Sequence, residues 1–99
     1  MKKINEILIE KKTKGAFKKE EIPSVYALIE CYRRYQSDVY GRKLDFRKAL
    51  NEFIELIYIP ISSEIKEKGS RNFYKEFISE TFSTMERNKK ASTLSAVTA

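Results

Sequence analysis

The stretch from Leu44 to Pro60, LDFRKALNEFIELIYIP, constrains the fold of this chain more than any other. It begins as a charged segment, becomes almost continuously apolar from Phe53 to Ile59, and ends at a proline. The apolar run contains Glu55 and is too short to cross a bilayer, which takes about 20 apolar residues. Apolar residues around much of a helix are typical of a helix that is buried on several sides. The stretch therefore predicts the central core helix of a small helical domain.

The two ends of this helix also follow from the sequence. Asp45 is a good N-cap, because its carboxylate can accept hydrogen bonds from the first free backbone N–H groups. Pro60 removes one backbone hydrogen bond and crowds the preceding turn, so a kink or break is expected there, with a kink favoured. Helical spacing resumes after the proline and continues to Lys68. Residues 46–68 would span about 35 Å, as one kinked helix or as two.

Three further segments carry apolar residues at helical spacing. The first covers Lys2–Lys12. The second begins at Pro23, a favoured first helical position, and ends at Gly41. The third begins with Ser70 as its N-cap and fades near Asn88. The chain has only three glycines and two prolines, and no alternation of period two indicates a strand.

These segments predict an all-α fold, an antiparallel four-helix bundle with a long, Pro-kinked third helix and a flexible C-terminal tail. The chain is short enough for one domain, predicted over residues 1–90. Residues 91–99, ASTLSAVTA, carry no side-chain charge and no clear period, and they form the predicted tail. The residues expected on apolar helix faces are Ile4, Ile7, Leu8, Val25, Leu28, Ile29, Tyr32, Tyr35 or Gln36, Val39, Phe46, Leu50, Phe53, Ile54, Ile57, Ile61, Ile65, Phe73, Phe77, Ile78, Thr81, Phe82 and Met85.

Several kinds of chemical site have no support in the sequence. The chain has no histidine, which is the commonest general base and a frequent zinc ligand. It has no glycine-rich phosphate loop. The single cysteine, Cys31, lies in an apolar stretch, so we expect a buried structural thiol and not a nucleophile. We therefore expect no catalytic residue, no metal site, no cofactor and no small-molecule substrate.

Positive charge is concentrated in two clusters, and the net charge is +6. One cluster is N-terminal, and the other surrounds the turn before the third helix, near Tyr35 and Tyr40. Such clusters can bind nucleic acid or an anionic membrane surface, or they can simply keep a small protein in solution. The predicted basic surface consists of Lys11, Lys12, Lys14, Lys18, Lys19, Arg33, Arg34, Arg42 and Lys43.

The stretch LDFRKALNEFIELIYIP, with its Leu-Asp start, central asparagine and aromatic-aliphatic end, resembles the third helix of the immunity proteins for class II (pediocin-like and lactococcin-like) bacteriocins. The Lys-rich opening MKKINEIL, the size, the basic charge and the uncharged tail are similar too. The resemblance covers residues 24–90. It implies a cytoplasmic four-helix bundle that protects the producer cell at the inner face of the membrane. The partner there would be the sugar-uptake permease (mannose phosphotransferase system) with bound bacteriocin.

The resemblance also implies where recognition takes place. In that family specificity is attributed to the last helix and the C-terminal tail, and a basic face would meet anionic lipid. The chain departs from the family pattern at Pro60 and in having no Trp. The expected partner-binding residues are Arg87, Lys89, Lys90, Leu94 and Val97.

The residues themselves leave other functions open. The main alternative is a small basic nucleic-acid-binding or regulatory protein of a phage, plasmid or archaeal virus, and another is an adaptor that binds a second protein. The salt dependence of binding distinguishes a nucleic-acid-binding protein from an immunity protein, because binding to phosphate weakens steeply as the salt concentration rises. The N-terminal apolar run is too short for a signal peptide, so the expected location is the cytoplasm, including the inner face of the membrane.

Overall fold

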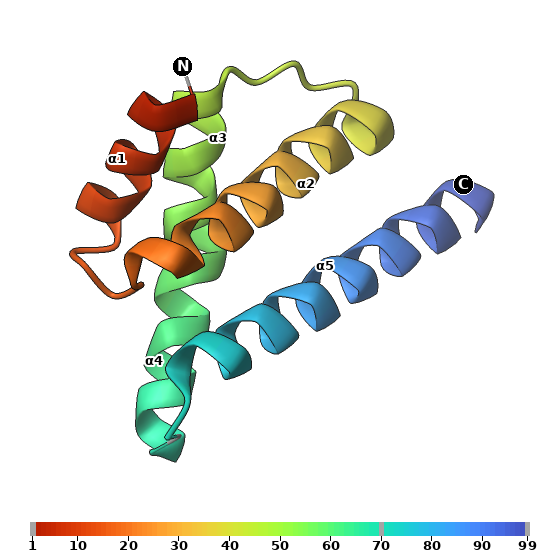
Figure 1. The fold of residues 1–99 in the computed structure, drawn as a ribbon. Helices are drawn as coiled ribbons and strands as arrows, with labels where there is room; N and C mark the ends of the chain where they lie inside the picture. The colour runs from red at the N-terminus through yellow and green to blue at the C-terminus, as the bar shows by residue number, and fades with distance from the viewer. Residues whose placement is uncertain (1, 70, 99) are drawn as a thin grey trace.

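The computed structural model describes the backbone of residues 2–69 and 71–98 and the side chains of residues 3–69 and 71–87. Over this part of the chain the structure is helical and has no strand, which confirms the all-α prediction. The helices, shown in Figure 1, are α1 (Lys2–Lys12), α2 (Ile22–Tyr40), α3 (Phe46–Phe53), α4 (Ile59–Lys68) and α5 (Phe73–Thr98), with a short 3-10 turn at Lys19–Glu21 and a π-helical turn at Ile54–Tyr58.

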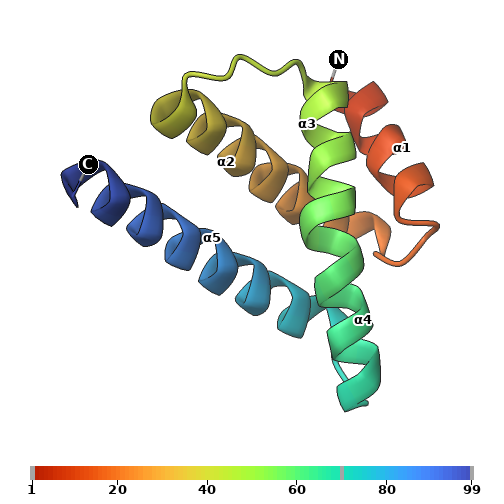
Figure 2. The same cartoon turned by 180° about the vertical axis from the view of Figure 1, so that it is seen from behind.

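The molecule is flat, with principal extents of 42 × 35 × 18 Å. Helices α2 and α5 run in the same general direction in both views, and the segment formed by α3 and α4 crosses them (Figures 1 and 2). Helix α1 packs on α2 close to α3, and the C-terminal half of α5 projects beyond the other helices. The predicted antiparallel bundle is not confirmed by this arrangement.

A cluster of aromatic rings forms the centre of the core. Phe77 of α5 is fully buried. Around its ring lie those of Phe17, Tyr58, Phe73 and Phe53, at centroid distances of 5.1, 5.7, 6.0 and 6.3 Å. Such distances are favourable for aromatic pairs. Phe53 is fully buried, as predicted, whereas Phe17 anchors the loop between α1 and α2 although the pattern assigned it to no helix.

Helical conformation continues from α3 through Pro60 into α4, so residues 46–68 form one helical segment and not two. In the turn before the proline, the backbone N–H of Ile59 donates to the carbonyl of Ile54, five residues earlier. This spacing is wider by one residue than in an α-helix. The wider turn accommodates the proline ring and its missing N–H. A kink at Pro60 stays a prediction.

Local capping fixes the helix ends. The Asp45 carboxylate accepts from a backbone N–H three residues later at 2.8 Å, which confirms it as the N-cap of α3. Gly41, with φ of 65°, ends α2 in the left-handed conformation that suits a glycine. The N-cap of α5 differs from the prediction, because Asn72 accepts from the backbone N–H three residues later at 3.1 Å. Ser70 lies outside the described residues.

The predicted apolar face of α1 is wrong for Ile4 and Ile7, whereas Leu8 packs against the core as predicted. Ile4 and Ile7 are 56% and 46% exposed, whereas Ile9 is fully buried. The helix is rotated so that Asn5 faces α2 and donates to the Tyr26 hydroxyl at 3.0 Å. The hydrogen-bonded side chain of Asn5 therefore lies on the face of α1 where the spacing predicted isoleucine.

Helix α5 also departs from the prediction in two ways. Phe82, expected on the inward face, is 51% exposed. The backbone is helical through Thr98 and does not fade near Asn88, so residues 91–98 continue α5. The side chains from Asn88 onward lie outside the described residues, and a functional division at residue 90 stays a prediction.

Candidate partner-binding groove

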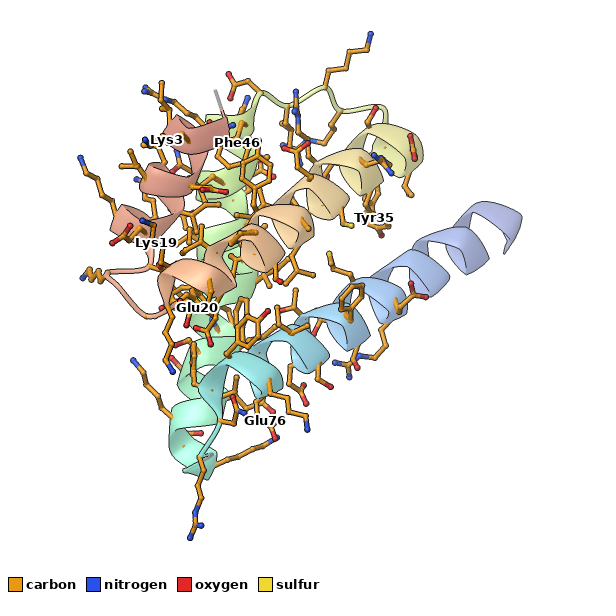
Figure 3. All side chains as sticks on the ribbon, in the orientation of Figure 1. Lys3, Lys19, Glu20, Tyr35, Phe46 and Glu76 are labelled. Atoms are coloured by element: carbon orange, nitrogen blue, oxygen red, sulfur yellow. The ribbon has the colours of Figure 1, made fainter. Side chains whose placement is uncertain are left out.

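Helices α2 and α5 border a groove of about 220 Å³. Helix α5 contributes Phe82 and Met85, and α2 contributes Tyr35 and Val39. Figure 3 labels Tyr35 on the side of α2 that faces α5. Phe82 is 51% and Val39 38% exposed, so both helices leave apolar surface open along the groove.

The rim of the groove carries charges of both signs. Arg34 and Asp38 come from α2, and Glu86 comes from α5. An apolar floor with a charged rim is the usual anatomy of a protein-binding surface. The groove therefore suits a peptide segment better than a strongly charged ligand.

Cys31 lines the same groove and is exposed, so the prediction of a buried thiol is wrong. Its position on the helix explains the error. The inward stripe of α2 includes Leu28 and Tyr32, and Cys31 lies beside that stripe, on the flank that turns toward α5. Apolar spacing does not define where the buried face of a helix stops. Residues beside that face are buried only where another helix packs on them.

The structure describes one of the five predicted partner-binding side chains. Arg87 is exposed on α5, where its guanidinium donates to the Thr84 hydroxyl at 3.4 Å, and it does not line the groove. The other four are Lys89, Lys90, Leu94 and Val97, whose side chains lie outside the described residues. Phe82 and Val39 could not be predicted as surface residues, because their spacing matches the inward stripes of their helices.

Two arginines of the predicted basic surface have structural partners. Arg42 binds the Glu52 carboxylate through both of its terminal nitrogens, at 2.6 and 3.1 Å, which is a strong bidentate geometry. The Tyr32 hydroxyl donates to the same carboxylate at 2.8 Å. Arg33 donates to the Leu44 carbonyl at 2.6 Å. These bonds tie the connection between α2 and α3 to both helices.

The same network shifts the pKa values of its members. Hydrogen bonds from Arg42 and Tyr32 lower the pKa of the Glu52 carboxyl. Burial, together with the hydrogen bond to Glu52, raises the pKa of Tyr32 to about 12. The hydrogen bond with Glu52 also raises the pKa of Arg42. Near neutral pH the network therefore keeps one protonation state, as expected of a structural element and not of an acid–base catalyst.

The rest of the second basic cluster is electrostatically mixed. Arg34 and Lys43 line a shallow polar hollow of about 400 Å³. Glu30 and Asp38 line the same hollow. Glu30 also pairs with Arg33 at 3.6 Å. Carboxylates beside these basic residues reduce the attraction of this surface for phosphate.

The predicted basic surface also includes five lysines near the N-terminus. All five are exposed, and none forms an ion pair with a described carboxylate. They lie at the end of α1, in the following loop and in the turn before α2, where Figure 3 labels Lys19. They are Lys11, Lys12, Lys14, Lys18 and Lys19.

The chain matches no protein-family model, no curated protein and no solved structure. Within the described residues, no group of three or more His, Cys, Asp or Glu side chains could hold a metal ion. In that same part of the chain, no helix combines the length and apolar character needed to cross a membrane.

Proposed function

We propose that this chain is a bacteriocin immunity protein. It would protect the producer cell from the cytoplasm by binding the complex of a class II bacteriocin and its receptor permease at the inner face of the membrane. The observation that carries the proposal is the apolar groove between α2 and α5, which leaves Phe82 open on the last helix. The resemblance of residues 44–60 to the third helix of that family supplies the class of partner.

The groove has the features that concentrate binding energy. Aromatic side chains dominate interfaces when a partner covers them completely, and Phe82 still has half of its surface to bury. Met85 beside it is a flexible apolar side chain that adapts to different partners. An apolar helix laid between two helices is a common recognition mode. We therefore expect Phe82 to contribute more to partner binding than the charged rim.

Survival of bacteriocin-sensitive cells tests the proposal. Cells that express the chain should survive at least one member of a panel of class II bacteriocins that kills cells with an empty vector. Phe82→Ala should abolish protection without lowering the amount of protein. Leu56→Ala is the matched control, because Leu56 is 64% exposed and does not line the groove. If the whole panel kills cells with and without the chain equally, the proposal is wrong.

Nucleic-acid binding is the second candidate, and the N-terminal lysine cluster favours it. Five exposed ammonium groups within nine residues, Lys11 to Lys19, have no described carboxylate partner. Fluorescence anisotropy with a labelled duplex and a labelled single strand, at low and at physiological salt, tests this function. Submicromolar binding at physiological salt would make nucleic acid the partner. Binding confined to low salt would be non-specific attraction to phosphate.

A further inference from the structure

A cavity of about 820 Å³ lies between the loop after α1 and helix α4. The last residue of α1, the loop after it, the π-helical turn, α4 and the first residue of α5 form its walls. Its volume falls in the range of about 300–1,000 Å³ that is typical of small-molecule sites. The cavity and the groove between α2 and α5 share no lining residue.

The cavity has an excess of positive charge. Lys12, Lys14 and Lys66 line it, no acidic residue does, and none of the three lysines is ion-paired with a described carboxylate. The two smaller hollows differ, since each is lined by residues of both signs. Uncompensated ammonium groups around one concave surface attract an anion.

The rest of the lining is mainly apolar. Ile54 and Ile65 are buried, Phe73 is half-buried, and Ile59 is 52% exposed although it lines the cavity. Hydroxyl groups add hydrogen-bonding capacity, with Ser62 buried on α4. A ligand that satisfies this lining needs a negative head group and a hydrocarbon portion.

Two irregular stretches of backbone meet at the cavity. Lys14 has φ of 54°, and among the described residues it alone adopts positive φ without being a glycine. That conformation is unfavourable for a residue with a Cβ. The π-helical turn contributes Ile54 and Tyr58 to the wall, and such turns are frequent at functional sites. Glycine adopts this conformation at a lower energetic cost than lysine does, so a lysine at position 14 is unusual for its backbone.

We propose that this cavity binds an anionic amphiphile. The phosphate or carboxylate head group interacts with Lys12, Lys14 and Lys66, and the hydrocarbon portion packs against Ile54 and Ile59. The ligand comes either from an anionic membrane surface or as a free molecule with the same head and chain. The site is independent of the proposed partner groove, so the proposal does not depend on the immunity function.

Calorimetry with three probes tests the chemistry of the site. Dodecyl phosphate, kept below its critical micelle concentration, has both the head and the chain. Inorganic phosphate has the head alone, and dodecyl maltoside has a chain without charge. We expect dodecyl phosphate to bind at least about tenfold more tightly than inorganic phosphate or dodecyl maltoside. Inorganic phosphate can interact only with the lysines, and dodecyl maltoside only with the apolar part of the lining. Equal affinity for dodecyl maltoside, or no binding of dodecyl phosphate, would overturn the proposal.

Matched charge variants locate the site. One protein carries Lys12→Gln, Lys14→Gln and Lys66→Gln. The control carries three Lys→Gln substitutions at residues that are exposed and do not line the cavity, which are Lys3, Lys48 and Lys75. Both lose three charges, so general attraction falls equally. We expect the cavity variant to lose at least about tenfold in affinity for dodecyl phosphate and the control less than about threefold. Equal losses would overturn the proposal.

A steric variant keeps the test valid if removing three lysines disturbs the fold. Ser63 is exposed and lines the cavity, so Ser63→Phe adds bulk to the lining without changing the charge. This variant should also weaken dodecyl phosphate binding by at least about tenfold. Circular dichroism checks that each variant is folded. A folded Ser63→Phe protein with unchanged affinity would place binding elsewhere and contradict the proposal.

Vesicle flotation distinguishes the two sources of the ligand. Phosphatidylglycerol vesicles present the anionic lipid, and phosphatidylcholine vesicles are the neutral reference. Flotation with phosphatidylglycerol that the cavity variant loses and the control keeps supports a membrane lipid. Binding of dodecyl phosphate without flotation supports a free amphiphile. Flotation that both triple variants lose equally would be surface attraction and would contradict a cavity site.

Discussion

Two phenylalanines on α5, five positions apart, predict very different consequences for the same substitution. Phe77 is fully buried among four aromatic rings, whereas Phe82 is 51% exposed beside the groove. Phe77→Ala should lower the free energy of unfolding by about 3–5 kcal/mol, because it removes a buried ring and leaves a cavity. Full burial of a phenylalanine side chain contributes about 1.5–3 kcal/mol. Since Phe82 is about half buried and water can fill its place, Phe82→Ala should cost about 1 kcal/mol.

Urea denaturation followed by circular dichroism measures both values on the same protein. The slope of the unfolding free energy against urea should be the same in both variants, since α5 packs on the same core. A loss of stability above about 3 kcal/mol for Phe82→Ala would mean that this ring belongs to the core and the groove is closed. A loss below about 1.5 kcal/mol for Phe77→Ala would mean that α5 is not held by the aromatic cluster.

The remaining predictions concern single interactions. Thr81 is fully buried and its hydroxyl has no hydrogen-bond partner among the described residues, so Thr81→Val should raise the free energy of unfolding by about 1 kcal/mol in urea denaturation. Lys14→Gly should raise the free energy of unfolding by about 0.5–1 kcal/mol in the same assay, because glycine adopts positive φ without strain. The same substitution should weaken amphiphile binding. A loss of stability would contradict the argument that Lys14 is strained. The folded-state pKa of Glu52 is lowered, so its contribution to stability is present above the ordinary pKa of 4.5 and is lost as the pH falls through the folded value. Wild type should therefore lose more stability than Glu52→Gln on acidification. The pKa of Tyr32 is raised to about 12, so its contribution is complete below 10.0 and is lost as the pH rises through about 12, a loss that Tyr32→Phe should not show.

Local signals in the sequence predicted the helices well. Apolar spacing together with Gly41 and the Asp45 N-cap predicted the C-terminal end of α2 and the start of α3, because capping depends on residues a few positions apart. The core position of Phe53 followed from the same spacing. Phe17 escaped prediction because a loop has no periodicity, and its burial depends on contact with α5.

The arrangement of the helices could not be predicted in the same way. Short connections favour antiparallel neighbours in sequence, but α2 and α5 are separated in sequence by the crossing segment of α3 and α4. Their contact leaves one flank of α2 open, which exposes Cys31 and Val39. Apolar spacing in the sequence shows which face of a helix is apolar, but it does not show how much of that face neighbouring helices cover.

The two candidate sites differ in how far the sequence indicates them. The N-terminal lysines are evident in the sequence. The groove is not, because Phe82 and Val39 match the inward stripes, and Arg87, which the resemblance indicates, does not line it. The cavity could not be predicted, because it brings Lys14 and Lys66 together from segments about fifty residues apart in sequence. Glu52, which pairs with Arg42, is also distant in sequence, so the spacing that placed Arg42 on the basic surface did not indicate this ion pair.

Co-purification with the sugar permease tests partner binding through the groove most directly. Membranes from sensitive cells that express the tagged chain would be solubilised with and without a bacteriocin from which the chain protects. We predict that the permease co-purifies with wild type when the bacteriocin is present, that Phe82→Ala loses it, and that Leu56→Ala retains it. Absence of the permease with wild type, or equal recovery with Phe82→Ala, would contradict binding through the groove between α2 and α5.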